Sequence, residues 1–170
     1  MCLECDGYSH DAALHALDLR IRVHGWTLLQ VGDESSAFTY TVGLLESYGH
    51  PELIILDVKR GLQVELLTRL ASSIATTGRM SDVVTTLERL RFVEVHSSQM
   101  QPNHFAMWAE RYGHLPAAGD VLQVLLPDDA FCGQHVGAVT RLDRPRLTPS
   151  PFGHPNRAQR RQRKRRGNAA

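Results

Sequence analysis

The most constraining feature of the sequence is an apolar run that is followed at once by a helical repeat. The run LIILDV, at 53–58, has the length and composition of a strand covered on both faces. The next segment places an apolar residue at every fourth position and stops at Gly78; the repeat comprises Leu62, Leu66, Leu70 and Ile74. A doubly covered strand beside a long amphipathic helix requires layers of sheet and helix, so this pair predicts an α/β protein.

The other segments predict further strands and helices around this pair. Ser9 is a suitable N-cap and Gly25 a suitable stop for a first helix. Within TYTVGL, Gly43 indicates a bulge or a close backbone approach in a core strand. The predicted elements are a helix at 10–24, a hairpin from 26–31 and 37–45, strands at 53–58, 91–95 and 121–128, and helices at 61–78 and 103–113. We therefore expect a mixed α/β (α+β) fold: a single layered domain with a central mixed sheet and about three helices.

Composition limits the class of protein. A chain of 170 residues with 42% hydrophobic and 22% charged residues is typical of one soluble domain. No apolar run approaches the roughly 18 residues that a membrane span needs, and the first residues lack the basic and apolar regions of a signal peptide. The sequence predicts a cytoplasmic protein without a membrane partner.

The end of the chain differs sharply from the rest. From Thr140 onward closely spaced prolines interrupt the pattern, which predicts a compact domain at 1–139 and a disordered Pro/Arg-rich arm at 140–170. The stretch RAQRRQRKRR, at 157–166, holds seven of the chain's 19 basic residues and none of its 18 acidic ones, which leaves 12 basic against 18 acidic residues in the rest. Its basic residues are Arg157, Arg160, Arg161, Arg163, Lys164, Arg165 and Arg166.

Such an arm suits contact with phosphates. Arginines neutralise phosphate charge, release counterions and stack on unpaired bases, so we expect RNA or the ribosome as the partner. The simpler interpretation is a solubilising tail on an acidic body, and that acidic body could itself bind a protein.

Two cysteines near the N-terminus raise the question of a metal site. Cys2 and Cys5 have the spacing at which two thiolates grip one tetrahedral ion, and Cys132 and His135 have the same gap. A zinc ion held by these four residues would fasten the N-terminus to the end of the domain. Other interpretations are a redox pair, an N-terminal nucleophile at Cys2, or thiols without chemistry.

Histidines suggest an enzymatic alternative. His50 lies beside Glu52, and His96 and His104 flank a polar loop, so the four residues could line a cleft. The alternative function is then a metal-dependent or cysteine hydrolase of an undescribed class. The simpler interpretation is that these histidines are polar surface residues at the ends of helices and strands. We therefore expect a protein that is not an enzyme.

Several motifs together carry a family resemblance. MCLECDGYS at the start, TYTVGL at 39–44, GHPEL at 49–53 and VLQVLLPD at 121–128 resemble the bacterial domain of unknown function 4262, over roughly residues 1–130. The resemblance implies a compact α/β domain and little about chemistry. A looser resemblance, to mycobacterial zinc-linked factors with an N-terminal CxxC that act in ribosome hibernation, implies a zinc-responsive regulator of translation.

Overall fold

The structure, a computed structural model, describes residues 9–32, 37–78, 90–127 and 140–145. Its centre is a five-stranded mixed sheet with the order β1-β2-β3-β5-β4. The strands are β1 (Thr27–Val31), β2 (Phe38–Val42), β3 (Glu52–Ile55), β4 (Arg91–Glu94) and β5 (Val121–Leu125). Only β3 and β5 run parallel; the other three neighbouring pairs are antiparallel. The described part thus confirms the predicted mixed sheet.

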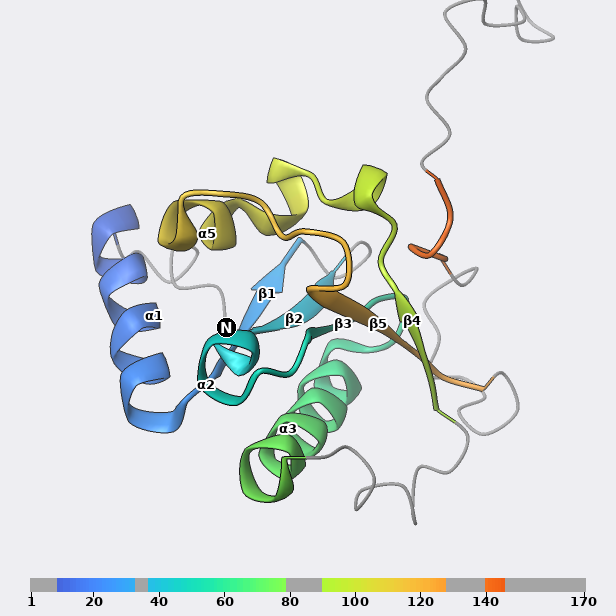
Figure 1. Ribbon diagram of the computed structural model, residues 1–170, viewed down its shortest axis with the longest axis horizontal. Helices are drawn as coiled ribbons and strands as arrows, with labels where there is room; N and C mark the ends of the chain where they lie inside the picture. The colour runs from blue at the N-terminus through green and yellow to red at the C-terminus, as the bar shows by residue number, and fades with distance from the viewer. Residues whose placement is uncertain (1–8, 33–36, 79–89, 128–139, 146–170) are drawn as a thin grey trace, which may run out of the picture.

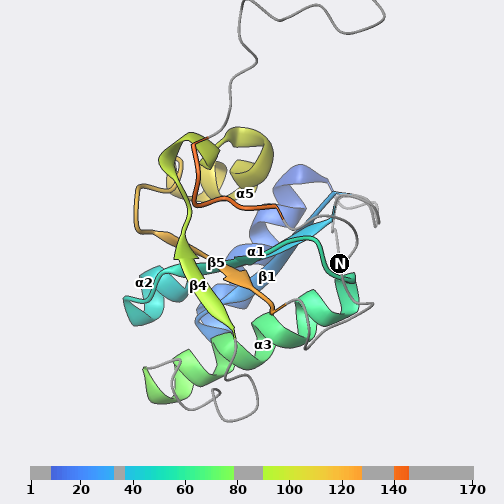
Figure 2. The same cartoon turned by 90° about the vertical axis from the view of Figure 1, so that its right-hand side faces the viewer.

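Helices cover both faces of the sheet (Figure 1). On one side lie α1 (His10–His24) and α5 (Pro102–Tyr112), and on the other lies α3 (Arg60–Thr77); the view turned by 90° shows the same three layers (Figure 2). Two short elements, α2 (Leu44–Tyr48) and the 3-10 turn η2 (Ser97–Gln99), complete the described elements. No described helix has the length and apolar character needed to cross a membrane.

The caps form where the sequence predicts them. The Ser9 hydroxyl accepts from the Ala12 N–H and begins α1, and Gly25 ends it in a left-handed conformation with φ 79°. Gly78 ends α3 in the same way, with φ 69°. A serine hydroxyl can replace a missing backbone acceptor at the start of a helix, and glycine adopts the left-handed conformation at its end without steric cost.

The predicted strand at 37–45 is wrong in its last residues. Strand β2 ends at Val42, Gly43 turns with φ 106°, and Leu44 and Leu45 begin α2 instead. Apolar residues continue across this boundary, so the change of element leaves no break in the hydrophobic pattern. The expected close approach at Gly43 is present, because a Cβ atom there would lie 2.6 Å from the Gly25 carbonyl oxygen.

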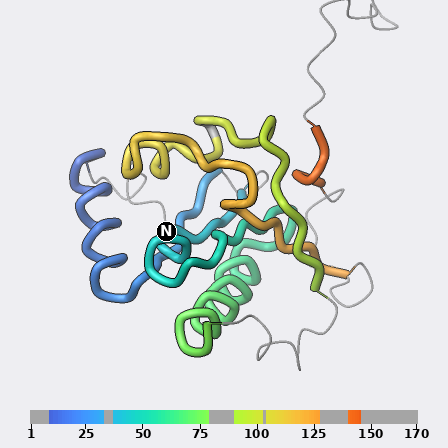
Figure 3. Tube along the Cα trace, viewed as in Figure 1, coloured from blue at the N-terminus to red at the C-terminus, as the bar shows by residue number. Residues whose placement is uncertain are grey.

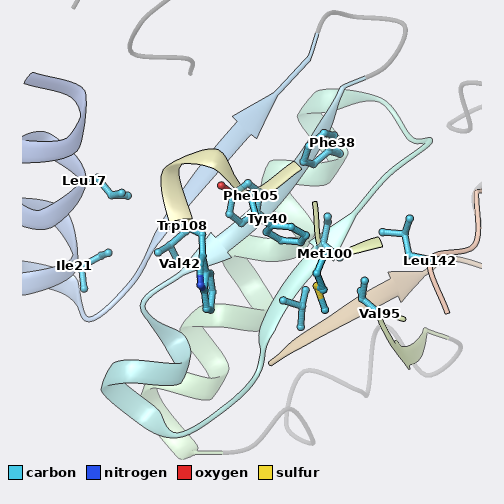
Figure 4. Packing of buried hydrophobic residues seen from close by; sticks show 12 residues of the cluster. Leu17, Ile21, Phe38, Tyr40, Val42, Val95, Met100, Phe105, Trp108 and Leu142 are labelled. Atoms are coloured by element: carbon cyan, nitrogen blue, oxygen red, sulfur yellow. The ribbon is translucent and has the colours of Figure 1, made fainter. Parts of the chain in front are cut away.

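Two hydrophobic clusters hold the layers together. The cluster under α1 and α5 includes Leu17, Tyr40, Phe105 and Trp108, with its members seen from close by in Figure 4. The cluster under α3 is built from aliphatic side chains, among them Leu53, Leu67, Leu70 and Ile74. Each buried Leu or Ile contributes roughly 2 kcal/mol to folding, so both faces of the sheet are needed for stability.

Residues 140–145 pack against this body. Leu142 is 3% exposed and joins the α5-side cluster, its N–H donates to the Gln123 side chain over 2.7 Å, and the His96 N–H donates to its carbonyl. The segment lies beside β4 and η2 in the tube view (Figure 3). The body therefore includes the first residues of the predicted arm.

Candidate functional site

The predicted zinc ligands lie outside the described residues. This holds for all four: Cys2, Cys5, Cys132 and His135. Within the described ranges, no group of three or more His, Cys, Asp or Glu side chains is arranged to hold a metal ion. The basic residues Arg157, Arg160, Arg161, Arg163, Lys164, Arg165 and Arg166 also lie outside the described residues. Zinc and RNA binding stay predictions.

The three histidines of the enzymatic alternative make local contacts. The His50 Nδ1 atom lies 2.7 Å from the Pro51 carbonyl oxygen. The His96 side chain caps η2 by accepting from the Ser98 N–H, and the His104 Nδ1 atom lies 3.2 Å from the Gln99 carbonyl oxygen. Between the described atoms, no hydrogen bond or ion pair links one of these histidines to another or to Glu52. The structure therefore does not assemble the four residues into a bonded catalytic group.

Glu52 is the most unusual polar residue of the described body. It begins β3 and is 0% exposed. Its Oε1 accepts from the Gly43 N–H over 2.7 Å and from the Leu45 N–H over 3.1 Å. Its Oε2 accepts from the Thr41 hydroxyl over 2.6 Å, and that hydroxyl in turn accepts from the Leu53 N–H. The carboxyl group thus joins the end of β2, the start of α2 and the start of β3.

Burial sets the proton affinity of this carboxyl group. Removal from water raises the pKa of Glu52 to about 7, although the hydrogen bonds from Thr41, Leu45 and Gly43 act in the opposite direction. None of the described ion pairs involves Glu52. A carboxyl group with such a pKa can take up or release a proton near neutral pH.

Two further polar groups lie buried under α5. Among the described residues, neither the Tyr40 hydroxyl nor the Trp108 Nε1 has a hydrogen-bond partner, and the two residues lie close together in Figure 4. Burial, followed by the negative charge of Glu52, raises the pKa of Tyr40, so its hydroxyl stays protonated. Both groups are donors held in an apolar setting, which costs stability unless something accepts from them.

An ion-pair network joins the helices on this side of the sheet. Arg111 of α5 donates from Nε to Asp18 of α1 over 2.8 Å and from Nη1 to Glu46 of α2 over 2.6 Å. The hydrogen bond from Arg111 lowers the pKa of Glu46. The guanidinium also lies 4.5 Å from the centre of the Tyr112 ring, whose hydroxyl donates to Glu46. The network ties three helices together around one cation.

A family model, described as a domain of unknown function (DUF4262), matches residues 20–131. The chain belongs to this family. The DUF4262 match covers every strand of the sheet and contains Glu52 and Arg111. Cys2, Cys5 and the basic arm lie outside the matched range, as do Cys132 and His135. No curated protein and no solved structure matches the chain.

In this DUF4262 domain, Glu52 links the turn between β2 and α2 to the start of β3. Its two oxygens already accept three hydrogen bonds and its side chain is closed off from water, so a substrate has no path to it in this conformation. The sequence predicted that Glu52 lines a cleft. The local pattern shows only that this glutamate follows Pro51 and precedes an apolar strand, and it does not show that the side chain is buried. Its distance from solvent depends on residues that are remote in the sequence.

Proposed function

We propose that the protein is a non-enzymatic binding protein that contacts RNA through its C-terminal arm, with a zinc ion on its N-terminal cysteines. The single observation that carries the proposal is the separation of charge. The stretch at 157–166 holds seven basic and no acidic residues, whereas the rest of the chain has 12 basic and 18 acidic residues, a net charge of −6. An RNA strand is attracted to one end of such a chain and repelled by the other.

The described body supports a binding role. Its most perturbed acid, Glu52, is buried and fully bonded, and its arginine network is occupied by Asp18 and Glu46. These contacts hold the body together, and the largest excess of basic residues in the sequence lies in the arm.

The RNA test compares charge-removing and charge-keeping variants of the full chain. Five arm arginines, at 160, 161, 163, 165 and 166, are changed to Gln in one variant and to Lys in the other. We expect the Gln variant to bind a fluorescein-labelled single-stranded RNA at least about tenfold more weakly at 0.1 M salt, and the Lys variant within about threefold of wild type. Fluorescence anisotropy measures both; equal affinity for all three proteins would contradict the proposal.

The zinc test measures metal content. Elemental mass spectrometry of the full chain is expected to find about one zinc per chain, lost in Cys2→Ser/Cys5→Ser. A chain purified anaerobically without chelators that carries no zinc would overturn this part of the proposal. Single variants Cys132→Ser and His135→Ala then test the predicted second half of the site.

A zinc-dependent association with the ribosome is the finer form of this proposal. Thiolate ligation depends on free zinc, so the N-terminus would fold around the ion when zinc is abundant and release it when zinc is scarce. Co-sedimentation with purified ribosomes at high and low free zinc tests it. Equal co-sedimentation under both conditions would remove the regulatory step and leave RNA contact as the function.

A further inference from the structure

An open groove of about 540 Å³ runs along the edge strand β1. Its lining residues come from the end of α1, from β1 and from α3. The groove lining contains Arg20 and His24 and no Asp or Glu, although the body as a whole is acidic. Arg20 is exposed and makes no ion pair with any described residue. A negatively charged ligand would therefore meet no repulsion from the walls of this groove.

Trp26 supplies an aromatic surface in the same groove. It follows Gly25, which ends α1, and it is partly buried against the α3-side cluster. Gly25 suits this position because its φ of 79° lies in the left-handed region, where other side chains are strained. The end of α1 therefore fixes the backbone that precedes Trp26. An indole fixed by its backbone and still partly exposed is a suitable platform for a nucleobase.

The opposite wall offers hydroxyl groups. Thr68, Ser72 and Thr76 of α3 are exposed, line the groove and recur every four residues, which places them on one face of the helix. The Thr76 hydroxyl donates to the Ser72 carbonyl over 2.8 Å, so Thr76 presents only acceptor lone pairs to a ligand. A ribose hydroxyl can donate to Thr76, and the hydroxyls of Thr68 and Ser72 can donate to phosphate oxygens.

We propose that this groove binds a short stretch of single-stranded RNA, with a base stacked on Trp26 and a phosphate held by Arg20 and His24. The inference rests on the proposed function, because it gives the same RNA a second contact on the body. An acidic peptide would use the positive charge and leave the tryptophan and the apolar wall of Leu28 and Val64 without a role. A nucleotide uses all three features of the groove.

The test uses the full chain and a fluorescein-labelled twelve-nucleotide oligouridylate. Arg20→Gln is compared with Arg22→Gln, which removes the same charge from an exposed residue of the same helix that does not line the groove. We expect Arg20→Gln to weaken binding about five- to tenfold and Arg22→Gln less than twofold. Trp26→Leu is expected to weaken binding about tenfold, with Trp26→Phe closer to wild type because a ring is kept.

The outcomes separate the groove from the arm. If the arm Gln variant loses binding while Arg20→Gln and Arg22→Gln bind RNA with equal affinity, the proposed groove site is wrong and the arm is the RNA contact. If only Arg20→Gln binds RNA more weakly and the arm variant binds like wild type, the groove site is supported and the proposed RNA contact of the arm is contradicted. Competition by polyglutamate as effective as that by unlabelled oligouridylate would make the groove a general anion site and overturn its assignment to RNA. Circular dichroism of each variant checks that it is folded.

Discussion

At the scale of single residues, Glu52 connects β3 to the end of β2 and to the start of α2. Its side chain reaches from β3 to the N–H groups of Gly43 and Leu45 and to the Thr41 hydroxyl. An apolar residue at this place would leave those donors buried without partners, at a cost of about 1–3 kcal/mol each. The turn between β2 and α2 therefore requires a side chain that accepts these hydrogen bonds. The variant Glu52→Gln keeps the size of the side chain and removes its charge, so it tests the carboxyl group itself.

Glu52→Gln is expected to remove a pH dependence of stability. Since burial raises the pKa of Glu52 to about 7, the folded protein holds this proton more tightly than the unfolded chain does. Its contribution is complete below the unfolded pKa and is lost as pH rises through 7, a fall of about 3 kcal/mol between pH 4 and pH 8.

Urea unfolding across this pH range measures the effect in wild type and in Glu52→Gln. Glu46→Gln is the matched control, because Arg111 lowers the pKa of Glu46 and its contribution is lost as pH falls. An identical pH profile for wild type and Glu52→Gln would show that the carboxyl group does not titrate in this range.

At the scale of elements, two glycine turns lie against each other. Gly25 ends α1 and Gly43 separates β2 from α2, and the backbone of one contacts the other. A Cβ atom at Gly43 would also lie 3.1 Å from the Cα atom of Trp26, so this turn packs closely against the residue that lines the groove. Both glycines have a positive φ that disfavours larger residues, and at Gly43 a backbone clash adds a steric reason.

Gly43→Ala tests this contact. The added Cβ would lie 2.6 Å from the Gly25 carbonyl oxygen at a backbone φ of 106°, so we expect a loss of about 3 kcal/mol or more. Gly113→Ala is the matched control: its φ is 76° and nothing lies within 4 Å of the added atom, so it should cost only about 1 kcal/mol. Chemical denaturation measures both; equal losses would mean that the contact between the turns is not tight.

At the scale of the whole molecule, the basic and acidic residues are separated along the chain. Under the proposed function, the acidic body repels RNA except at the groove, whose lining lacks carboxylates, and the basic stretch attracts it. Affinity should therefore depend on salt more steeply than the net charge of +1 suggests.

The salt dependence of RNA binding gives a count of the phosphates that are contacted. Seven basic residues that each neutralise one phosphate of a single strand predict a slope of log K against log salt of about −5. Anisotropy titrations from about 50 to about 300 mM potassium chloride measure the slope. The five-arginine Gln variant should fall to about −1, and an unchanged slope would place the contacts elsewhere.

Local pattern by itself determined most of the elements. The ends of two helices follow from three capping residues: α1 begins after Ser9 and ends at Gly25, and α3 ends at Gly78. Capping depends on short-range hydrogen bonds and on backbone conformation, which are local properties. The five strands were predicted from apolar and β-branched runs, and the family from motifs along the same stretches. The unequal charge of the arm and the body also follows from sequence alone.

Tertiary structure decided what the polar residues do. Glu52 was expected in a cleft, but contacts with Thr41, Gly43 and Leu45 bury it, and α2 forms where a strand was predicted. Arg20, Trp26 and Thr68 share a groove only because β1 lies at the edge of the sheet between α1 and α3. Burial and proximity arise from chain segments that are distant in sequence, and no local pattern encodes such neighbours.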